Sequence, residues 1–371
     1  MRRPPTRLVA ALSAIGASVT ATAGIATAAT SDGAHIPRPP AARVWVTTPD
    51  AALLLSDRGE VPFTEAPPTA LTITVDPRRT YQTIVGFGAS ITDSSAAVLY
   101  RLSPAQRDKV MRSLFDARSG NALSYLRQPM GASDFVVDGH YTYDDLPAGQ
   151  TDYRLERFSI AHDERQILPL LRQARRLNPQ LRVMASPWSP PAWMKTSGSL
   201  IGGRLIDDPR IYAAYALYFV KFIQAYSRAG VPIDAVTVQN EPQNRHPRGY
   251  PGMDLPVAQQ RKLIRVLGPA LRTAGLKTKI IAYDHNWAMH PDDLAATPPG
   301  EAPEVDYAAD VLADPEVSRW VAGTAYHCYF GEPGAQSTLR SRYPAKDIYF
   351  TECSGIRSAV PENTFSDTLK W

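Results

Sequence analysis

Cysteine is nearly absent from this sequence, and the scarcity excludes two kinds of architecture. Its 371 residues include only Cys328 and Cys353. Two cysteines cannot supply the disulfide framework of a small secreted domain, and they cannot form a zinc site by themselves. A single disulfide is one alternative, but we expect both residues to be free thiols.

A strong charge of one sign is also missing. The formal net charge is +4, and most of it comes from Arg2, Arg3 and Arg7 in an amino-terminal segment without acidic residues. The rest of the chain is close to neutral and has no long basic run interleaved with aromatic residues. This composition argues against nucleic acid as a partner.

Long hydrophobic runs are lacking, so we expect no stable membrane insertion. The three arginines precede a short, mildly apolar stretch, Leu8–Val19, which Ser and Gly residues interrupt. Ala26-Thr27-Ala28 then provides small residues at the positions that signal peptidases require. These features predict a cleaved signal peptide over residues 1–28 and a secreted protein.

The remaining chain has a globular composition, with 44% hydrophobic and 20% charged residues. Residues 29–42 are rich in Pro and Ala and are typical of a linker. Short alternating runs over residues 43–80, including 52–55 and 71–75, predict the strands of a small β domain. From residue 81 to 371, strand-like runs alternate with helical stretches, which indicates an α/β catalytic domain.

Seven strands are predicted in this α/β domain, at residues 84–90, 123–127, 182–186, 235–239, 279–282, 321–326 and 347–351. Ser103 with Gln106 forms a capping box before one helix, Asp208 precedes Pro209 at the start of another, and apolar residues recur at helical spacing over 160–177 and 257–274. Seven such units suit a (β/α)8 TIM barrel that stops after strand seven, or an open doubly wound sheet. The Gly86-Phe87-Gly88 turn lacks a third glycine, which disfavours the second alternative.

Two glutamates follow predicted strands. Glu241 lies in Val238-Gln239-Asn240-Glu241-Pro242, and Glu352 lies in Phe350-Thr351-Glu352-Cys353. The carboxyl ends of barrel strands face the active site, so we expect both side chains in one mouth. A pair of carboxylates in that position is what the cleavage of a glycosidic bond requires. The alternative is that each is a solvated loop residue.

Other side chains at strand ends fit sugar binding. Trp188 can stack on a pyranose, whereas we expect Trp193 to be structural. Arg127 and Asp134 can anchor hydroxyl groups, and the arginine can also hold a nucleophilic glutamate ionised. A tyrosine after the strand at 321–326 can contact the nucleophile, and the nearby His327 has the pattern of an ordinary buried histidine.

Metal and serine chemistry have weaker support. The acidic and histidine residues after the fifth predicted strand match no compact metal motif; they are Asp284, His285, His290, Asp292 and Asp293. No GxSxG sequence marks a serine nucleophile. We therefore expect no metal and no organic cofactor.

Five ordered motifs resemble glycoside hydrolase family 30, in particular its glucosylceramidases. They are Gly86-Phe87-Gly88-Ala89-Ser90-Ile91-Thr92-Asp93, the run from Tyr125 to Phe135, Ala185-Ser186-Pro187-Trp188, Gln239-Asn240-Glu241-Pro242 and Thr351-Glu352-Cys353. The resemblance implies a (β/α)8 barrel with a side β-sandwich, whose first strands lie in residues 43–80. It also implies that strand eight and most of the sandwich would lie beyond Trp371.

The resemblance further implies a retaining double displacement, with Glu241 as acid/base and Glu352 as nucleophile. Asn240 would bind the sugar 2-hydroxyl, and the other residues of the glucose subsite would be Arg127, Asp134, Trp188, Tyr329 and the loop residue Tyr250. Retention predicts carboxyl groups about 5 to 5.5 Å apart. We expect the charge of Glu352 to raise the pKa of Glu241, so that Glu241 is protonated.

The expected substrate is a β-glycoside, either a glucosyl lipid, as for a glucosylceramidase-like β-glucosidase, or a β-glucan. The alternatives within the family are a β-1,6-glucanase and a β-xylosidase. A different class of function is also open, that of a truncated pseudoenzyme that binds carbohydrate without hydrolysing it.

Overall fold

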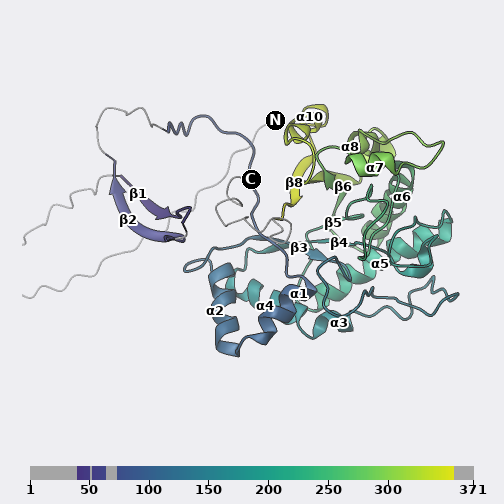
Figure 1. Cartoon of the computed structure of the whole chain (residues 1–371), viewed down its shortest axis with the longest axis horizontal. Coiled ribbons are helices and arrows are strands. Elements are labelled where there is room, and N and C mark those ends of the chain that lie inside the picture. The colour runs from purple at the N-terminus through teal and green to yellow at the C-terminus, as the bar shows by residue number, and fades with distance from the viewer. Residues whose placement is uncertain (1–39, 51, 64–72, 355–371) are drawn as a thin grey trace, which may run out of the picture. The chain divides into compact units, whose positions relative to one another are not determined.

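The computed structural model describes residues 40–50, 52–63 and 73–354, in two compact units that divide between Val75 and Asp76 (Figure 1). The described part of the first unit is an antiparallel pair, β1 (Ala41–Val46) and β2 (Ser56–Pro62). The strand predicted at 52–55 is wrong, because residues 53–55 form the bend between these strands. Residues 73–75 are not a regular strand, and the rest of the run predicted at 71–75 lies outside the described residues, as does the predicted signal peptide.

The second unit is built on a parallel sheet with the strand order β3-β4-β5-β6-β7-β8, which runs in the order of the sequence. The strands are β3 (Tyr125–Pro129), β4 (Arg182–Ser186), β5 (Ala235–Thr237), β6 (Lys279–Asn286), β7 (Val321–His327) and β8 (Asp347–Glu352). Sequential parallel strands joined through helices are the arrangement of a (β/α) barrel. Six of the seven predicted strands are confirmed, and all of their carboxyl ends lie at one edge of the sheet.

The first predicted strand, at 84–90, is wrong as a regular element. This segment runs beside β3, and the carbonyl groups of Phe87 and Ala89 accept hydrogen bonds from the backbone of Ser124 and Arg127 at 2.9 and 3.0 Å. Gly88 makes the approach possible, since a Cβ atom there would lie 1.5 Å from the carbonyl oxygen of Tyr125. This close approach to β3 takes the place of the regular hydrogen-bond pattern of a paired strand.

Local signals explain most of the helices. The capping box at Ser103 is present before α2, and the Asp208 side chain caps α5 by accepting from the Arg210 N–H group. The helix predicted over 160–177 is interrupted at Gln166, whose φ of −134° lies outside the helical region. The helices are α1 (Asp93–Arg101), α2 (Pro104–Phe115), α3 (Ala161–Glu164), α4 (Ile167–Leu177), α5 (Pro209–Arg228), α6 (Val257–Thr273), α7 (Pro291–Ala295), α8 (Tyr307–Leu312), α9 (Pro315–Ser318) and α10 (Gly334–Arg342).

The core lies between the sheet and these helices. Helix α5 contributes an almost continuous buried face, including Tyr215, Phe219 and Phe222, and it packs beside α6 (Figure 1). Among the described residues, no helix combines the length and the apolar character needed to cross a membrane. A second, smaller cluster of buried strand residues comprises Met184, Ala235, Ile281 and Ala325, and the polar side chains described below lie at the carboxyl ends of the strands.

Candidate active site

The carboxyl ends of β5 and β8 bring two glutamates together. Glu241 follows β5 after a short irregular segment, and Glu352 is the last residue of β8. One oxygen of each carboxyl group and one ring nitrogen of His327 all lie within 4.8 Å of one another. The structure thus places the two predicted carboxylates in one mouth, 111 positions apart in the sequence but adjacent in space.

Glu352 is held by a cation and a hydroxyl group. Arg127 on β3 donates from Nη1 to its Oε2 at 2.8 Å, and the Tyr329 hydroxyl donates to its Oε1 at 2.9 Å. Both contacts are charge-assisted, so they fix the orientation of the carboxylate. Arg127 and Tyr329 were both predicted as site residues, and both reach the site through Glu352.

Arg127 itself is buried, and besides Glu352 it contacts four neighbouring groups, one of which is the Ser186 hydroxyl at 3.3 Å from Nη2. Its Nη2 donates to Asn240 Oδ1 at 2.6 Å and to Asp284 Oδ2 at 2.9 Å. Its guanidinium group lies 4.8 Å from the centre of the Trp188 ring. In this structure one ring contact of Trp188 is therefore with an arginine, and the residue is only 5% exposed, whereas we expected an open platform for a sugar. Trp193 donates from Nε1 to Asp144, which is a structural contact, as expected.

Asp284, whose sequence context suggested at most a metal ligand, is the centre of this network. It is fully buried on β6, and its carboxylate contacts one side chain from each of the other five strands. The donors to Oδ2 are Arg127, Ser186 at 2.8 Å and Thr237 at 2.6 Å, and Oδ1 contacts Thr351 at 2.6 Å and His327 at 3.1 Å. Burial alone would raise the pKa of this carboxyl group, but Arg127 and the hydrogen bonds lower it far below its usual range.

The backbone explains how Asp284 reaches all of these partners. Its φ is +84°, and the pairing of β6 with β7 shifts between Tyr283 and His285. Such an irregularity redirects a side chain that a regular strand would place elsewhere. The carbonyl group of Asp284 also accepts the N–H of Glu241 at 2.9 Å, so the same residue fixes the backbone of the acid/base candidate.

His327 connects Asp284 with Glu241. Its Nδ1 lies 3.3 Å from Glu241 Oε1, and its Nε2 contacts Asp284. Burial disfavours a charge on the ring, but Glu352 and the hydrogen bonds to Asp284 and Glu241 outweigh it and raise the pKa of His327 to about 9. At neutral pH this histidine is therefore a cation between carboxylates. Its role in the site was missed, because the sequence pattern also fits an ordinary buried histidine.

Glu241 is the partner of that cation, and this corrects the expectation about its protonation. Burial would raise the pKa of Glu241, but the hydrogen bond from His327 and the charges of His285 and His327 lower it to about 2. The charge of Glu352, on which the expectation was based, is countered by a histidine that comes from β7. Glu241 has a φ of +49°, which places its side chain beside that ring.

Asn244, three residues after Glu241, is a second site residue that no motif in the sequence predicted. Its side-chain amide donates to Glu241 Oε2 at 3.1 Å and to the Tyr250 hydroxyl at 2.9 Å. Tyr250, predicted from the loop, is thereby connected to Glu241 through Asn244. Lys195 stabilises the loop that contains Tyr250, because its buried amine donates to the Gly252 and Leu200 carbonyl groups, both at 2.8 Å.

Asp134 is the most peripheral of the predicted site residues. It lies in the loop after β3, and the residue taken as a whole is exposed, although its carboxyl group lies close to the site. Enclosure of its carboxyl group and the charge of Glu352 raise the pKa of Asp134 to about 6. The loop therefore brings this side chain near the carboxylate pair without a direct contact to either glutamate among the hydrogen bonds of the described residues.

The same donor set must be considered as a metal site, since Glu241, His327 and Glu352 are typical ligands. Both ring nitrogens of His327 already face carboxylates, and Arg127 already neutralises Glu352. Protein cations occupy the positions next to the carboxylates, which favours acid–base chemistry over ion binding. The arrangement needs no cofactor to carry it out.

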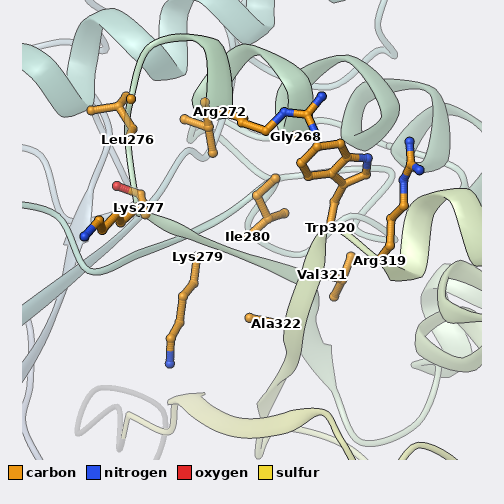
Figure 2. A pocket seen from close by; sticks show the side chains of 13 residues that line it. Gly268, Arg272, Leu276, Lys277, Lys279, Ile280, Arg319, Trp320, Val321 and Ala322 are labelled. Carbon is orange, nitrogen blue, oxygen red and sulfur yellow. The ribbon is translucent and has the colours of Figure 1, made fainter.

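The opposite ends of the strands carry a separate pocket of about 510 Å³, beside the first residues of β6 and β7 (Figure 2). Its wall includes Arg272 and Arg319, which lie 5.0 and 5.2 Å from the centre of the Trp320 ring. Gly268 leaves room for this ring, because a Cβ atom there would lie 2.3 Å from it. These contacts pack α6 against the short connection between α9 and β7, at the end of the sheet that stabilises rather than catalyses in barrels.

A parallel barrel sheet with two close carboxylates at the carboxyl ends of its strands is the architecture of glycoside hydrolases. Comparison with known proteins agrees. Residues 84–362 match the family model described as the glycosyl hydrolase family 30 TIM-barrel domain, which is more than half of the chain. This protein belongs to glycosyl hydrolase family 30, and its fold is the TIM barrel of that family.

Relatives within the family differ in their substrates. An endo-1,6-beta-D-glucanase of Neurospora crassa is 36% identical over 79% of this chain and 58% of its own length. The lysosomal acid glucosylceramidase of Mus musculus is 34% identical over 70% of this chain and 48% of its own length. Among solved structures, the endo-beta1,6-glucanase BT3312 superposes with a TM-score of 0.71 and 33% identity, covering 85% of this chain and 65% of that one. The chain thus spans about half to two thirds of the proteins it resembles.

Proposed function

We propose that this protein is a retaining β-1,6-glucanase in which Glu352 is the nucleophile and Glu241 the acid/base. The observation that carries the proposal is the close carboxylate pair, with one oxygen of each group within 4.8 Å. Retaining enzymes hold their carboxyl groups about 5 to 5.5 Å apart, whereas inverting enzymes need about 6.5 to 9.5 Å to admit a water molecule.

The two glutamates have environments that suit different tasks. Arg127 and Tyr329 bind both oxygens of Glu352, which aims the carboxylate and supplies a positive charge beside it. In the first step a Glu352 oxygen forms a bond to the anomeric carbon while the bond to the leaving oxygen breaks. Asn240, held by Arg127, is the expected contact for the sugar 2-hydroxyl.

The proton for the leaving oxygen comes from the pair of Glu241 and His327. Because His327 is protonated up to about pH 9 and lies 3.3 Å from Glu241 Oε1, the two side chains together hold one proton at neutral pH. As negative charge develops on the leaving oxygen, His327 passes this proton to Glu241, and Glu241 delivers it to the leaving oxygen, which leaves the pair without it. In the second step the pair takes a proton from water, and the resulting hydroxide releases the sugar from Glu352.

The choice of substrate rests on the relatives. The Neurospora protein and the solved structure with a TM-score of 0.71 are both named as endo-1,6-glucanases, and this favours a β-1,6-glucan over other β-glycosides. A glucosyl lipid is the second candidate, because the mouse relative of 34% identity is named as a glucosylceramidase.

A substrate panel tests both the chemistry and the choice. Purified protein is incubated with β-1,6-glucan, β-1,3-glucan, glucosylceramide and an aryl β-xyloside, and proton NMR follows the anomers of the product. We expect release of β-anomers from β-1,6-glucan first, followed by mutarotation. Initial release of the α-anomer would contradict retention, and faster turnover of glucosylceramide would overturn the proposed substrate.

Variants separate the glutamates from general effects of mutation. Glu352→Gln and Glu241→Gln should each abolish turnover of the glucan. Glu316→Gln is the matched control, since Glu316 lies on α9 at the opposite end of β7 and pairs with Arg319 on the surface. Binding of glucan without any hydrolysis by the wild type would instead support a carbohydrate-binding protein.

We also propose that the protein is exported. The amino-terminal pattern of residues 1–28 supports this, and so does the disulfide between Cys328 and Cys353, since such bonds persist in oxidising compartments. Mass spectrometry of the protein from culture medium should give an amino terminus after Ala28. Recovery of the uncleaved chain inside the cell alone would overturn export.

A further inference from the structure

The two cysteines form a disulfide, which corrects the expectation of free thiols, and both stand next to residues of the active site. Cys328 lies between His327 and Tyr329 at the end of β7. Cys353 directly follows Glu352 at the end of β8. The bond therefore joins the backbone that carries the nucleophile candidate to the backbone that carries two of its neighbours.

Hydrogen bonds close a small ring around this disulfide. The Cys328 N–H group donates to the carbonyl oxygen of Glu352 at 3.2 Å. The Tyr329 hydroxyl donates to Glu352 Oε1 at 2.9 Å and accepts from the Ser354 N–H group at 3.1 Å. The position of the Glu352 carboxylate thus depends on the distance between the ends of β7 and β8.

Regular sheet pairing alone leaves this distance weakly determined. The register of β7 and β8 shifts between Tyr326 and His327, just before the residues that matter. In the described part of the chain β8 pairs with β7 alone. Cys353 is exposed, and Glu352 is only partly buried, so side-chain packing adds little restraint at this point.

We propose that Cys328 and Cys353 are positioning residues, whose disulfide holds the Glu352 carboxylate against Tyr329 and Arg127 for attack on the sugar. This inference rests on the proposed function, in which Glu352 is the nucleophile. A dithiol reductant breaks the one S–S bond, yields two thiols and is itself oxidised to a disulfide. Reduction then frees the end of β8, while Arg127 on β3 and Asn240 after β5 keep their mutual hydrogen bond.

The sequence makes the experiment selective, because it contains no other cysteine. Oxidised wild type, wild type reduced with dithiothreitol and the double variant Cys328→Ser/Cys353→Ser are compared well below the lowest Tm of the three. Thiol titration verifies each state. The readouts are kcat and KM on β-1,6-glucan and the rate at which a 2-fluoro glycosyl fluoride labels Glu352 covalently.

We expect kcat and the labelling rate to fall by about tenfold or more on reduction, with KM nearly unchanged, since a small displacement of a reacting group has effects of this size. The double variant should match the reduced wild type and should not respond to reductant. Tyr329→Phe provides a second measurement, because it keeps the disulfide but loses the hydroxyl contact to Glu352. Reduction should then lower kcat much less than in wild type, because both changes disturb the same contact.

Three results would overturn the inference. Two free thiols in the purified protein would exclude the bond. Full kcat after complete reduction would show that the bond contributes stability alone, as would a loss of kcat that appears only where the reduced protein begins to unfold. An oxidised enzyme that neither turns over glucan nor labels at Glu352 would refute the proposed function as well, whereas an active enzyme insensitive to reduction refutes this inference alone.

Discussion

Replacement of Asp284 by Asn removes the one carboxylate that connects both halves of the active site. Asp284 accepts on Oδ2 from three donors, on β3, β4 and β5, and its Oδ1 contacts His327 and Thr351. An amide has one acceptor oxygen and one NH2 group. Whichever way the amide turns, its NH2 group faces at least one cationic N–H donor, that of Arg127 or that of His327, in a fully buried position.

The magnitude follows from the burial of the pair. Removing one partner of a buried ion pair costs about 3 to 5 kcal/mol when the other charge is left uncompensated. Here the cost is at most of that size, because Arg127 keeps its second partner Glu352 at 2.8 Å. If most of this loss appears in the transition state, where Arg127 must aim Glu352, kcat/KM falls by about two to three powers of ten. KM should change little, because Asp284 touches no position open to a substrate.

The pH dependence gives a second, independent readout. Asp284 helps to raise the pKa of His327 to about 9, so its loss lowers that pKa toward the ordinary value of 6.5. The pair of His327 and Glu241 then loses its proton at lower pH. The alkaline limb of the profile of kcat/KM should therefore move to lower pH in Asp284→Asn.

Steady-state kinetics on β-1,6-glucan across pH 5 to 10 provide the assay, and circular dichroism verifies the fold. Asp234→Asn is the matched control, because Asp234 accepts from Tyr125 at the opposite end of the strands. We expect the control to keep wild-type kinetics. If Asp284→Asn retained kcat/KM within about threefold of wild type and kept its alkaline limb, the network would not organise the site, and the reasoning would be wrong.

Three further predictions concern single contacts. Asn244→Ala removes the donor to Glu241 Oε2 and should reduce kcat about tenfold in steady-state assays, while Asn178→Ala, at the far end of β4, should not. Because the pKa of His327 is raised, its contribution to stability is complete below about pH 6.5 and is lost as pH rises through about 9. Urea titrations of wild type should show this fall in the free energy of unfolding, and those of His327→Gln should not. Gly268→Ala places a Cβ atom 2.3 Å from the Trp320 ring and should lower the free energy of unfolding by about 1 to 3 kcal/mol with kcat unchanged, and an equally stable variant would show that α6 can shift.

Local sequence signals predicted the elements that they alone determine. The cap at Asp208 and the capping box at Ser103 specify where α5 and α2 begin, and both are confirmed. The strand predicted at 84–90 failed because its form depends on β3: Gly88 admits the Tyr125 carbonyl group at a distance that no other residue permits. A periodic pattern contains no information about that neighbour.

The residues of the active site also divide into those that the sequence could predict and those that it could not. The glutamates could be predicted because each follows an apolar strand, and barrel strands converge at their carboxyl ends. The protonation of Glu241 could not, since His327 reaches it from a strand 86 positions away and reverses the expected direction of its pKa. Asp284 was present in the sequence as one acidic residue among several, and only its positive φ and its five partners distinguish it.

The disulfide also changes how this region can come apart. It closes a loop of sequence separation 25 that contains all of α10 and all of β8. A protease that cuts the connection between α10 and β8 would leave two fragments covalently joined, with Glu352 still tethered beside His327. Fraying of α10 would likewise not release the strand. The disulfide therefore keeps β8, which carries Glu352, attached to β7 even when α10 is cut off from β8 or unfolds.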